Sequence, residues 1–402
     1  MQILYIEGGV TAPQGYFATG VACGLKENGD RDLALVCSED VAAVAGVFTT
    51  NKVKGHSLKL TMQNIKSGYA TAIVINSGNA NACVGDKGDT DARAIAAKTA
   101  ELLECSSEEI LVGSTGVIGV PLDIDKVLDG LDEAVSAMDP EGGHEAELAI
   151  MTTDTIAKEI AVQFELQGEP VIIGGMAKGS GMISPNMATM IAVLTTDANI
   201  SRTLLDTALK EICQKTFNRV IVDGDTSVCD MVVIFANGLA DNPGIVKQDG
   251  DYYAFYDALD KVCSFLAKQI AVDGEGATKL IEVHVSGAKN AESAYLACSA
   301  IAKSPLVKTA VYGCDANWGR IITAVGYSGA DIAPDRIDIS INKVFVCRSG
   351  SAAIYDEDKV IEQLEKKEIH INVNLNSGTF SDRIWTCDFS EDYIRINGSY
   401  RS

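Results

Sequence analysis

The sequence predicts a mixed α/β fold of the α+β kind. Short β-rich apolar runs lie between turn residues, helical periodicity fills the stretches between them, and 47% of the 402 residues are apolar. That apolar share is sufficient for a sizeable core. The runs that we expect to form buried strands are 33–37, 72–75, 171–173, 220–222 and 306–311.

Helical patterns lie between these runs. Residues 94–103 and 252–270 show helical spacing of apolar side chains. A further helix is expected after Ser201, which we interpret as its N-cap. Its apolar positions are Leu204, Leu205, Ala208, Leu209, Ile212 and Cys213. The stretch 336–396 is typical of alternating strands with one helix near 359–366.

The length suggests two or three lobes at about 150 residues per domain. No stretch rich in Pro, Gly or Ser separates such lobes along the chain. We therefore expect the lobes to pack against each other.

The net charge excludes two classes of partner. The chain has 33 basic and 55 acidic residues, a formal charge of −22, and no local basic patch. Nucleic-acid phosphates and anionic lipids would repel it. No apolar run approaches the roughly 20 residues of a membrane-spanning helix, and no secretory signal is evident at the start. With 11 cysteines, an odd number without a Cys-x-x-Cys pair, the sequence predicts a cytoplasmic protein.

Familiar catalytic arrangements are not supported. The four histidines are isolated, so no metal site is predicted. His284 and His370 alternate with apolar neighbours, which is typical of strand faces. A serine–histidine mechanism lacks its Gly-x-Ser-x-Gly turn.

Two glycine-rich segments, 113–119 and 174–181, do not match nucleotide-binding loops. The first lacks the Gly-x-Gly spacing of a dinucleotide fold, and in the second the lysine precedes its glycine. No bound cofactor is therefore predicted. A glycine-flanked turn after a strand can instead aim a hydroxyl and a backbone N–H at one point, as an oxyanion hole requires.

The most unusual segment is 178–194, where a polar glycine-rich loop runs directly into an apolar run with Thr189 at the junction. Local composition alone favours Thr189 as the first residue of a buried strand. A second interpretation is that cleavage before Thr189 frees its α-amine. With a pKa of about 7.7–8.0, that amine can serve as the base for the threonine hydroxyl without any histidine.

At this segment the sequence resembles the ornithine acetyltransferase (glutamate N-acetyltransferase) family of arginine biosynthesis. The resemblance covers nearly the whole chain, and its motifs occur in the family's order. The matching segments are 46–51, 76–83, 114–119, 178–190, 223–227, 313–320 and 397–402.

The resemblance implies layered sheets with helices, interwoven lobes and self-cleavage between Ala188 and Thr189. The products are an α chain, 1–188, and a β chain, 189–402, which the family assembles into a heterotetramer of two α and two β chains. The implied reaction moves the acetyl group of N2-acetyl-L-ornithine to L-glutamate through an acetyl-threonine ester. Whether acetyl-coenzyme A is also a donor stays open.

The family pattern also assigns site residues. It places the oxyanion hole at Thr115 and Gly116. The matching substrate-binding positions are Thr152, Lys178, Thr189, Glu275, Asn397 and Ser402. Lys178 suits a substrate carboxylate and Glu275 suits an ammonium, because an amino acid offers opposite charges at its ends.

Two departures from the family pattern are present. Val228 and Cys229 replace the Thr and Asn expected before Asp230, and Ala316 stands where the family usually has proline. The first change alters polarity near the expected site, and the second loosens a turn.

Two alternatives to the transferase remain. One is an autoprocessing aminopeptidase or amidase of similar architecture, which passes its acyl group to water. The other is a non-catalytic amino-acid-binding protein whose chain is not cleaved.

Overall fold

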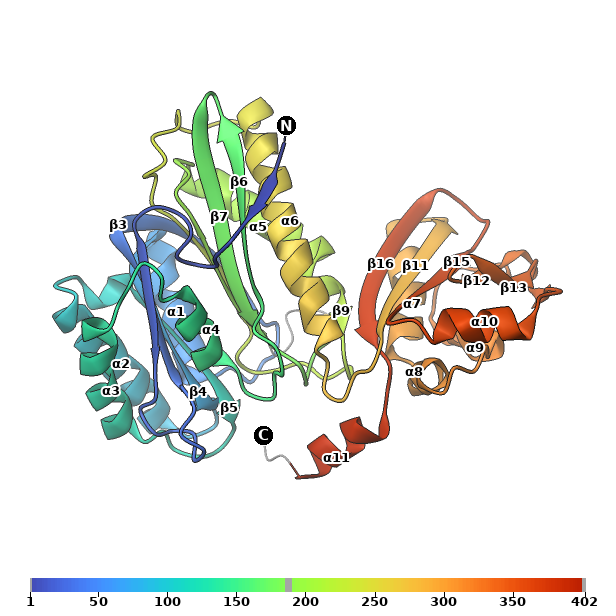
Figure 1. Ribbon diagram of the computed structural model, residues 1–402, viewed down its shortest axis with the longest axis horizontal. Helices are drawn as coiled ribbons and strands as arrows, with labels where there is room; N and C mark the ends of the chain where they lie inside the picture. Colours follow the sequence, from blue (N-terminus) through green and yellow to red (C-terminus); the bar gives the residue numbers. More distant parts are fainter. Residues whose placement is uncertain (1, 185–189, 400–402) are drawn as a thin grey trace.

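The computed structural model describes residues 2–184 and 190–399. Within these ranges the chain forms two β-sheets and eleven α-helices, so the predicted mixed α/β class is confirmed (Figure 1). No helix in the described ranges is both long enough and apolar enough to cross a membrane.

The first sheet has nine strands and interleaves sequence from before and after residues 185–189. Its order is β1-β6-β7-β8-β10-β3-β4-β5, with β2 paired to β3. The strands are β1 (Leu4–Ile6), β2 (Tyr16–Val21), β3 (Leu33–Phe48), β4 (Tyr69–Asn79), β5 (Ile110–Val117), β6 (Glu159–Leu166), β7 (Glu169–Lys178), β8 (Ile191–Thr196) and β10 (Met231–Ala236). β8 pairs antiparallel with β7 and parallel with β10, which in turn pairs with β3. The two later strands therefore lie in the middle of the sheet.

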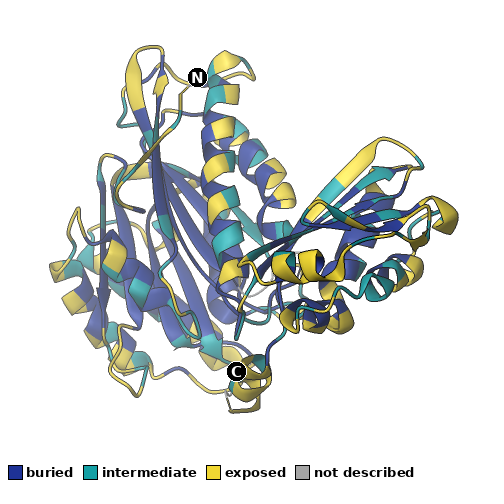
Figure 2. Cartoon of the chain, turned by 45° about the vertical axis from the view of Figure 1, so that its right-hand side comes forward, coloured by how far each residue is buried: buried dark blue, intermediate teal, exposed yellow. Residues whose placement is uncertain are grey.

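Helices cover both faces of this sheet. All six residues of β8 are buried, because successive side chains enter different cores. Ala192 and Leu194 face the core formed with α5 (Arg202–Lys215) and α6 (Gly250–Val272), whereas Ile191 and Val193 belong to the core that α4 contributes to. The strands in the middle of the sheet are buried along most of their length (Figure 2). The other covering helices are α1 (His56–Asn64), α2 (Asp86–Leu102), α3 (Ile124–Ser136) and α4 (Gly143–Ile150).

The second sheet has seven strands in the order β14-β13-β12-β15-β11-β16-β9 and lies beside the first (Figure 1). Its strands are β9 (Val220–Ile221), β11 (Leu280–Ala288), β12 (Asp338–Ile341), β13 (Val344–Arg348), β14 (Ser351–Ala352), β15 (Glu368–Asn374) and β16 (Phe380–Cys387), and its helices are α7 (Ala291–Lys303), α8 (Pro305–Tyr312), α9 (Trp318–Tyr327) and α10 (Glu357–Leu364). His284 and His370 lie on the neighbouring strands β11 and β15, as predicted.

Four of the five predicted strand segments are confirmed, but 306–311 is wrong: it forms α8. A short apolar run does not distinguish a strand from a buried helix. The deciding signals precede it, since Ser304 Oγ accepts the N–H of Val307 at 3.3 Å and Pro305 occupies the first helical turn.

The predicted helices are confirmed with changed boundaries. The helix expected at 94–103 begins earlier, at Asp86, and the one at 252–270 is α6. α5 begins directly after Ser201, although the Ser201 side chain makes no capping hydrogen bond. The alternating-strand prediction for 336–396 missed α11 (Glu391–Ser399), which has no buried residue to give an apolar face.

One buried carboxylate organises the loop between β2 and β3. Asp32 is 0% exposed and accepts backbone N–H groups from four successive residues at 2.6–3.1 Å. These residues are Cys23, Gly24, Leu25 and Lys26. The loop is therefore folded around a single side chain.

We expect Asp32→Ala to lower the free energy of unfolding by about 3 kcal/mol, because several N–H groups lose their acceptor. Chemical denaturation measures this change. The control is Asp30→Ala in the same loop, an exposed position whose side chain accepts a hydrogen bond from Asn28, which should change stability by less than about 0.5 kcal/mol. Equal effects of the two variants would contradict this account.

Candidate active site

A cavity of about 70 Å³ lies where β5, β7 and α11 approach each other. Its wall contains six of the predicted site residues: Thr115, Gly116, Thr152, Lys178, Glu275 and Asn397. Ala188, Thr189 and Ser402 lie outside the described residues. Segments separated by more than two hundred residues thus meet at one point.

The end of β5 provides Thr115 and Gly116. β5 runs parallel to β4, and Gly116 pairs with Gly78 where the register shifts. Gly116 has a φ of +129°, and a Cβ there would lie 2.4 Å from the Gly78 carbonyl carbon. Only glycine fits such a turn. Thr115, at 2% exposure, is fixed beside it.

The end of β7 provides Lys178, which is 2% exposed. Its Nζ donates to Thr152 Oγ1 at 2.8 Å and lies 3.7 Å from Asp154 Oδ2. The Asp154 carboxylate also accepts the N–H of Thr152 at 3.0 Å and of Gly179 at 2.6 Å. One carboxylate therefore holds both segments that carry predicted substrate-binding residues.

The opposite wall provides Glu275 and Asn397. Asn397 Nδ2 donates to Glu275 Oε2 at 2.7 Å. Figure 1 shows α11 leaving the second sheet and running back toward the first, which brings Asn397 to the cavity. Glu275 N–H donates to the Ser180 carbonyl at 2.8 Å, and a Cβ on Gly181 would lie 2.3 Å from the Glu275 carboxyl carbon. Glycine at 181 leaves room for the glutamate.

Beneath the cavity, Lys158 bridges two aspartates. Its Nζ donates to Asp154 Oδ1 at 2.8 Å and to Asp273 Oδ2 at 2.6 Å, and the side chains of the three are 0–3% exposed. Asp273 also accepts the N–H of Thr155. We name this group, Asp154, Lys158 and Asp273, the buried bridge. It joins the segments carrying Thr152 and Lys178 to the one carrying Glu275.

The charges in the buried bridge stabilise each other. Burial opposes ionisation of Asp154, but the ammonium groups of Lys178 and Lys158 outweigh it and hold the pKa of Asp154 below its usual value. Burial likewise opposes the charge on Lys158, yet its two aspartates raise the pKa of Lys158. Beside them, burial raises the pKa of Glu147 well above its usual value.

The chain is anchored on both sides of residues 185–189. Before them, the Asp223 carboxylate accepts the N–H of Met182 at 2.6 Å and of Ile183 at 2.9 Å. After them, Asp230 Oδ1 accepts the N–H of Met190 at 3.1 Å. Two aspartates from one loop thus hold the flanks of the predicted cleavage point.

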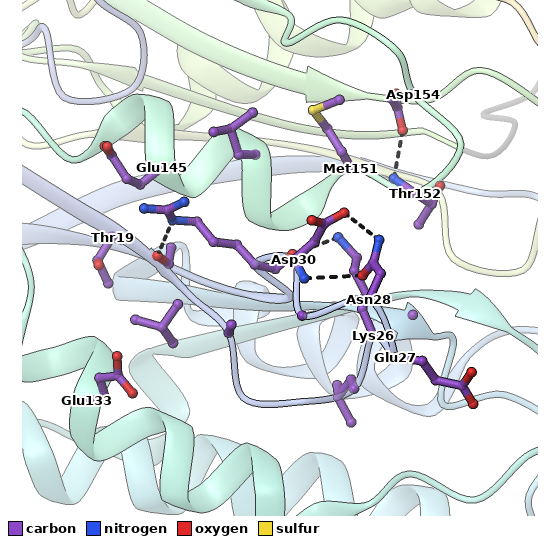
Figure 3. A pocket seen from close by; sticks show the side chains of 18 of the residues that line it. Thr19, Lys26, Glu27, Asn28, Asp30, Glu133, Glu145, Met151, Thr152 and Asp154 are labelled. Carbon is purple, nitrogen blue, oxygen red and sulfur yellow. Dashed lines mark hydrogen bonds between the residues drawn. The ribbon is translucent and has the colours of Figure 1, made fainter.

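A larger hollow of about 1220 Å³ adjoins the cavity and shares Thr152 with it. Figure 3 shows Thr152 and Asp154 at one side of this hollow and the β2–β3 loop, with Lys26 and Asp30, across from them. The larger hollow and the smaller cavity thus meet at Thr152.

Sequence reasoning missed the buried bridge. Lys158 and Asp154 look like ordinary surface charges in the sequence, and Asp273 is 115 residues from Lys158. The departures Val228 and Cys229 do line the cavity, whereas Ala316 packs on the core of the second sheet. Over residues 2–184 and 190–399, no group of three His, Cys, Asp or Glu side chains is arranged to hold a metal ion.

Comparisons with known proteins point to one family. The ArgJ family profile matches residues 17–402. A protein named Arginine biosynthesis bifunctional protein ArgJ, from Caldanaerobacter subterraneus subsp. tengcongensis, is 50% identical over 100% of both chains. One of the same name from Symbiobacterium thermophilum is 48% identical over 99% of this chain and 100% of its own. A crystal structure of arginine biosynthesis bifunctional protein argJ from Bacillus halodurans is 48% identical, with a TM-score of 0.50, over 51% of this chain and 97% of the solved chain.

We expect Lys158→Met to lower the free energy of unfolding by about 3–5 kcal/mol, since it leaves two buried carboxylates without their shared cation. The control is Lys210→Met, where the lysine is 56% exposed and pairs with Asp206 on α5. That variant should change stability by less than about 1 kcal/mol. Denaturant titration at pH 7 compares them, and a loss of similar size in both would contradict the role of the bridge.

The difference in stability between wild type and Lys158→Met should depend on pH, and the pKa shifts give the direction of that dependence. The lowered pKa of Asp154 stabilises the fold above its unfolded value of 3.8, and this contribution is lost as pH falls below that value. The raised pKa of Lys158 stabilises the fold below 10.5 and ceases to do so at higher pH. The stability gap between wild type and Lys158→Met should therefore narrow below about pH 4. A constant gap from pH 3 to 7 would contradict this.

Proposed function

This chain belongs to the ArgJ family and is an acyltransferase of arginine biosynthesis, and we propose that it transfers the acetyl group of N2-acetyl-L-ornithine to L-glutamate. The products are L-ornithine and N-acetyl-L-glutamate. The observation that carries this proposal is that six residues matching the family's site meet at one cavity. The cavity walls offer a hydroxyl, an ammonium, a carboxylate and an amide, the groups that an N-acylated amino acid requires.

The enzyme first cleaves itself between Ala188 and Thr189. The Thr189 hydroxyl attacks the Ala188 carbonyl, the peptide bond is replaced by an ester, and water hydrolyses the ester to leave Thr189 with a free α-amine. Two observations support this step. The full-length relatives align over the whole chain, whereas the solved B. halodurans chain is about half as long. The anchoring of Met182, Ile183 and Met190 fixes both flanks of the proposed scissile bond.

The same hydroxyl then performs turnover. Thr189 Oγ attacks the acetyl carbonyl of acetylornithine, its own α-amine accepts the proton, and ornithine leaves. Thr115 Oγ1 and the Gly116 N–H stabilise the oxyanion, a contribution of about 2.7–4 kcal/mol per donor in comparable sites. Glutamate then enters the same cavity, and its amine takes the acetyl group from the ester.

Charge complementarity orients both substrates. Lys178 binds the α-carboxylate, which ornithine and glutamate share. Glu275, held by Asn397, binds the side-chain ammonium of acetylornithine, while Thr152 and Ser402 complete the contacts. The hollow beside Thr152 is the route by which substrates enter.

Several finer properties belong to the same proposal. The protein works in the cytoplasm, needs no bound cofactor, and assembles as two α and two β chains. The word bifunctional in the relatives' names supports a second acetyl donor, for which acetyl-coenzyme A is our candidate.

An amidase of similar architecture is the alternative that shares the first half-reaction. It differs in its acceptor, because water rather than glutamate receives the acetyl group. The decisive observation is therefore the fate of the acetyl group when glutamate is present.

We expect purified protein to consist of two chains that separate at residue 188 and to form N-acetylglutamate from acetylornithine only when glutamate is added. Thr189→Ala should remain one chain and be inactive, since it lacks the attacking oxygen. The control Thr203→Ala, at an exposed position on α5, should behave as wild type. Intact-mass analysis and product chromatography report both properties. Acetylornithine consumption that is independent of glutamate would replace the transferase with the amidase.

We expect Glu275→Gln to lower kcat/KM for acetylornithine by about 10- to 100-fold, because a charge-assisted contact to the ammonium is lost. The value for glutamate should fall far less. The amide oxygen introduced at position 275 can still accept the hydrogen bond from Asn397 Nδ2, so the contact between these two side chains is kept. Glu362→Gln, exposed on α10, is the matched control. A larger loss for glutamate than for acetylornithine would reverse our assignment of the two charges.

A further inference from the structure

The two amino acids of the proposed reaction place different demands on the cavity. Acetylornithine carries a carboxylate and a side-chain ammonium, whereas glutamate carries a carboxylate at each end. Glu275 suits the ammonium but repels the side-chain carboxylate of glutamate. Within residues 2–184 and 190–399, Lys178 is the only cation in the wall of the smaller cavity. Recognition of glutamate therefore calls for a second cation close to Lys178.

Lys26 is the cation that the structure offers. It lines the larger hollow together with Thr152 and Asp154 and lies across the hollow from them (Figure 3). Its side chain passes close to Gly78, since a Cβ on Gly78 would lie 3.5 Å from Lys26 Cγ. Gly78 pairs with Gly116 at the end of β5. Lys26 thus lies next to the strand pair that carries the predicted oxyanion hole.

The main chain of Lys26 is fixed, but its ammonium is only partly used. Asp32 accepts the N–H of Lys26 at 2.9 Å, and Lys26 Nζ donates to the Arg31 carbonyl at 2.7 Å. An ammonium has three N–H donors. In the described parts of the chain, this ammonium makes no other hydrogen bond and no ion pair. It therefore has donors available for a ligand.

The charges around Lys26 favour an anionic ligand. Burial lowers the pKa of Lys26, and the ammonium of Lys178 lowers it further. The carboxylates of Asp32, Asp30 and Asp154 act in the opposite direction without overcoming these effects. Two ammonium groups that repel each other are both stabilised by a ligand that brings a carboxylate to each. Glutamate is such a ligand, and acetylornithine is not.

The other charged residues of the hollow do not take this role. Arg31 Nε donates to the Gly20 carbonyl at 2.9 Å, which directs the guanidinium away from Thr152. Glu27 and Glu133 are exposed, so water and salt screen their charges. Lys26 therefore remains the cation nearest to the junction of the hollow and the cavity.

We propose that Lys26 binds the side-chain carboxylate of glutamate and thereby selects an acidic acceptor. The inference rests on the proposed transferase function and adds to it the position that distinguishes the two substrates. With the shared α-carboxylate on Lys178, the side chain of acetylornithine extends to Glu275. The side chain of glutamate extends instead toward the hollow at Thr152. One cavity thus serves both half-reactions through two side-chain positions.

The test uses Lys26→Met, which keeps the length of the side chain and removes its charge. In a reaction with an acetyl-enzyme intermediate, kcat/KM for each substrate reports its own half-reaction. We expect kcat/KM for glutamate to fall by about 10- to 100-fold and that for acetylornithine to stay unchanged. The control is Lys126→Met, an exposed lysine that also donates to a carbonyl of the β2–β3 loop, at Gly24, and should behave as wild type.

The choice of acceptor separates recognition from structure. Wild type should acetylate glutamate at least about 10-fold better than glutamine, which has a similar shape without the charge. Lys26→Met should reduce this ratio toward one, and Lys26→Arg, which retains a cation, should keep the preference for glutamate. A purely structural role predicts that both acceptors lose rate together. The wild-type ratio needs no variant to fold.

The outcomes are distinct. Equal use of glutamate and glutamine by the wild type, or a wild-type ratio in folded Lys26→Met, would overturn the role of Lys26. So would an equal loss of kcat/KM for acetylornithine and for glutamate in that variant. A wild-type enzyme that forms no N-acetylglutamate from acetylornithine would instead overturn the proposed function itself.

Discussion

The site depends on one ammonium group that two aspartates share. Lys158 joins Asp154, which holds the Thr152 and Lys178 segments, to Asp273, two residues before Glu275. The wall that contains Lys178 and the wall that contains Glu275 are therefore fixed relative to each other by a contact beneath the cavity rather than in it. A buried charge without its partners destabilises the fold. Lys158, Asp154 and Asp273 therefore stabilise the fold only as a complete group.

The interleaved sheet explains how a chain cleaved between residues 188 and 189, as proposed, would stay in one piece. β8 and β10, which come after residue 189, pair with β7 and β3, which come before it. All twelve residues of β8 and β10 are buried. The products of the proposed cleavage would thus share hydrogen-bonded strands and two cores.

The sequence predicted the elements whose structure is set by neighbouring residues. It did not predict contacts that depend on residues far away along the chain. The runs 33–37 and 72–75 were recognisable as strands because β-rich apolar segments between turns have few alternatives. The run 306–311 has the same composition, but Ser304 and Pro305 make it a helix. The site residues came from a family resemblance carried by several motifs. Lys158 could not be found in this way, since nothing in its neighbours indicates an aspartate 115 residues away.

The central claim is that one threonine, freed by self-cleavage, carries the acetyl group between two amino acids. Its most direct test is peptide mass spectrometry of the enzyme quenched during turnover with acetylornithine in the absence of glutamate. The account predicts one acetyl group on the oxygen of the peptide that begins at Thr189, and its disappearance with formation of N-acetylglutamate when glutamate is added. An unmodified Thr189 peptide would contradict it. So would an acetyl group that is found on another residue and is transferred from there to glutamate.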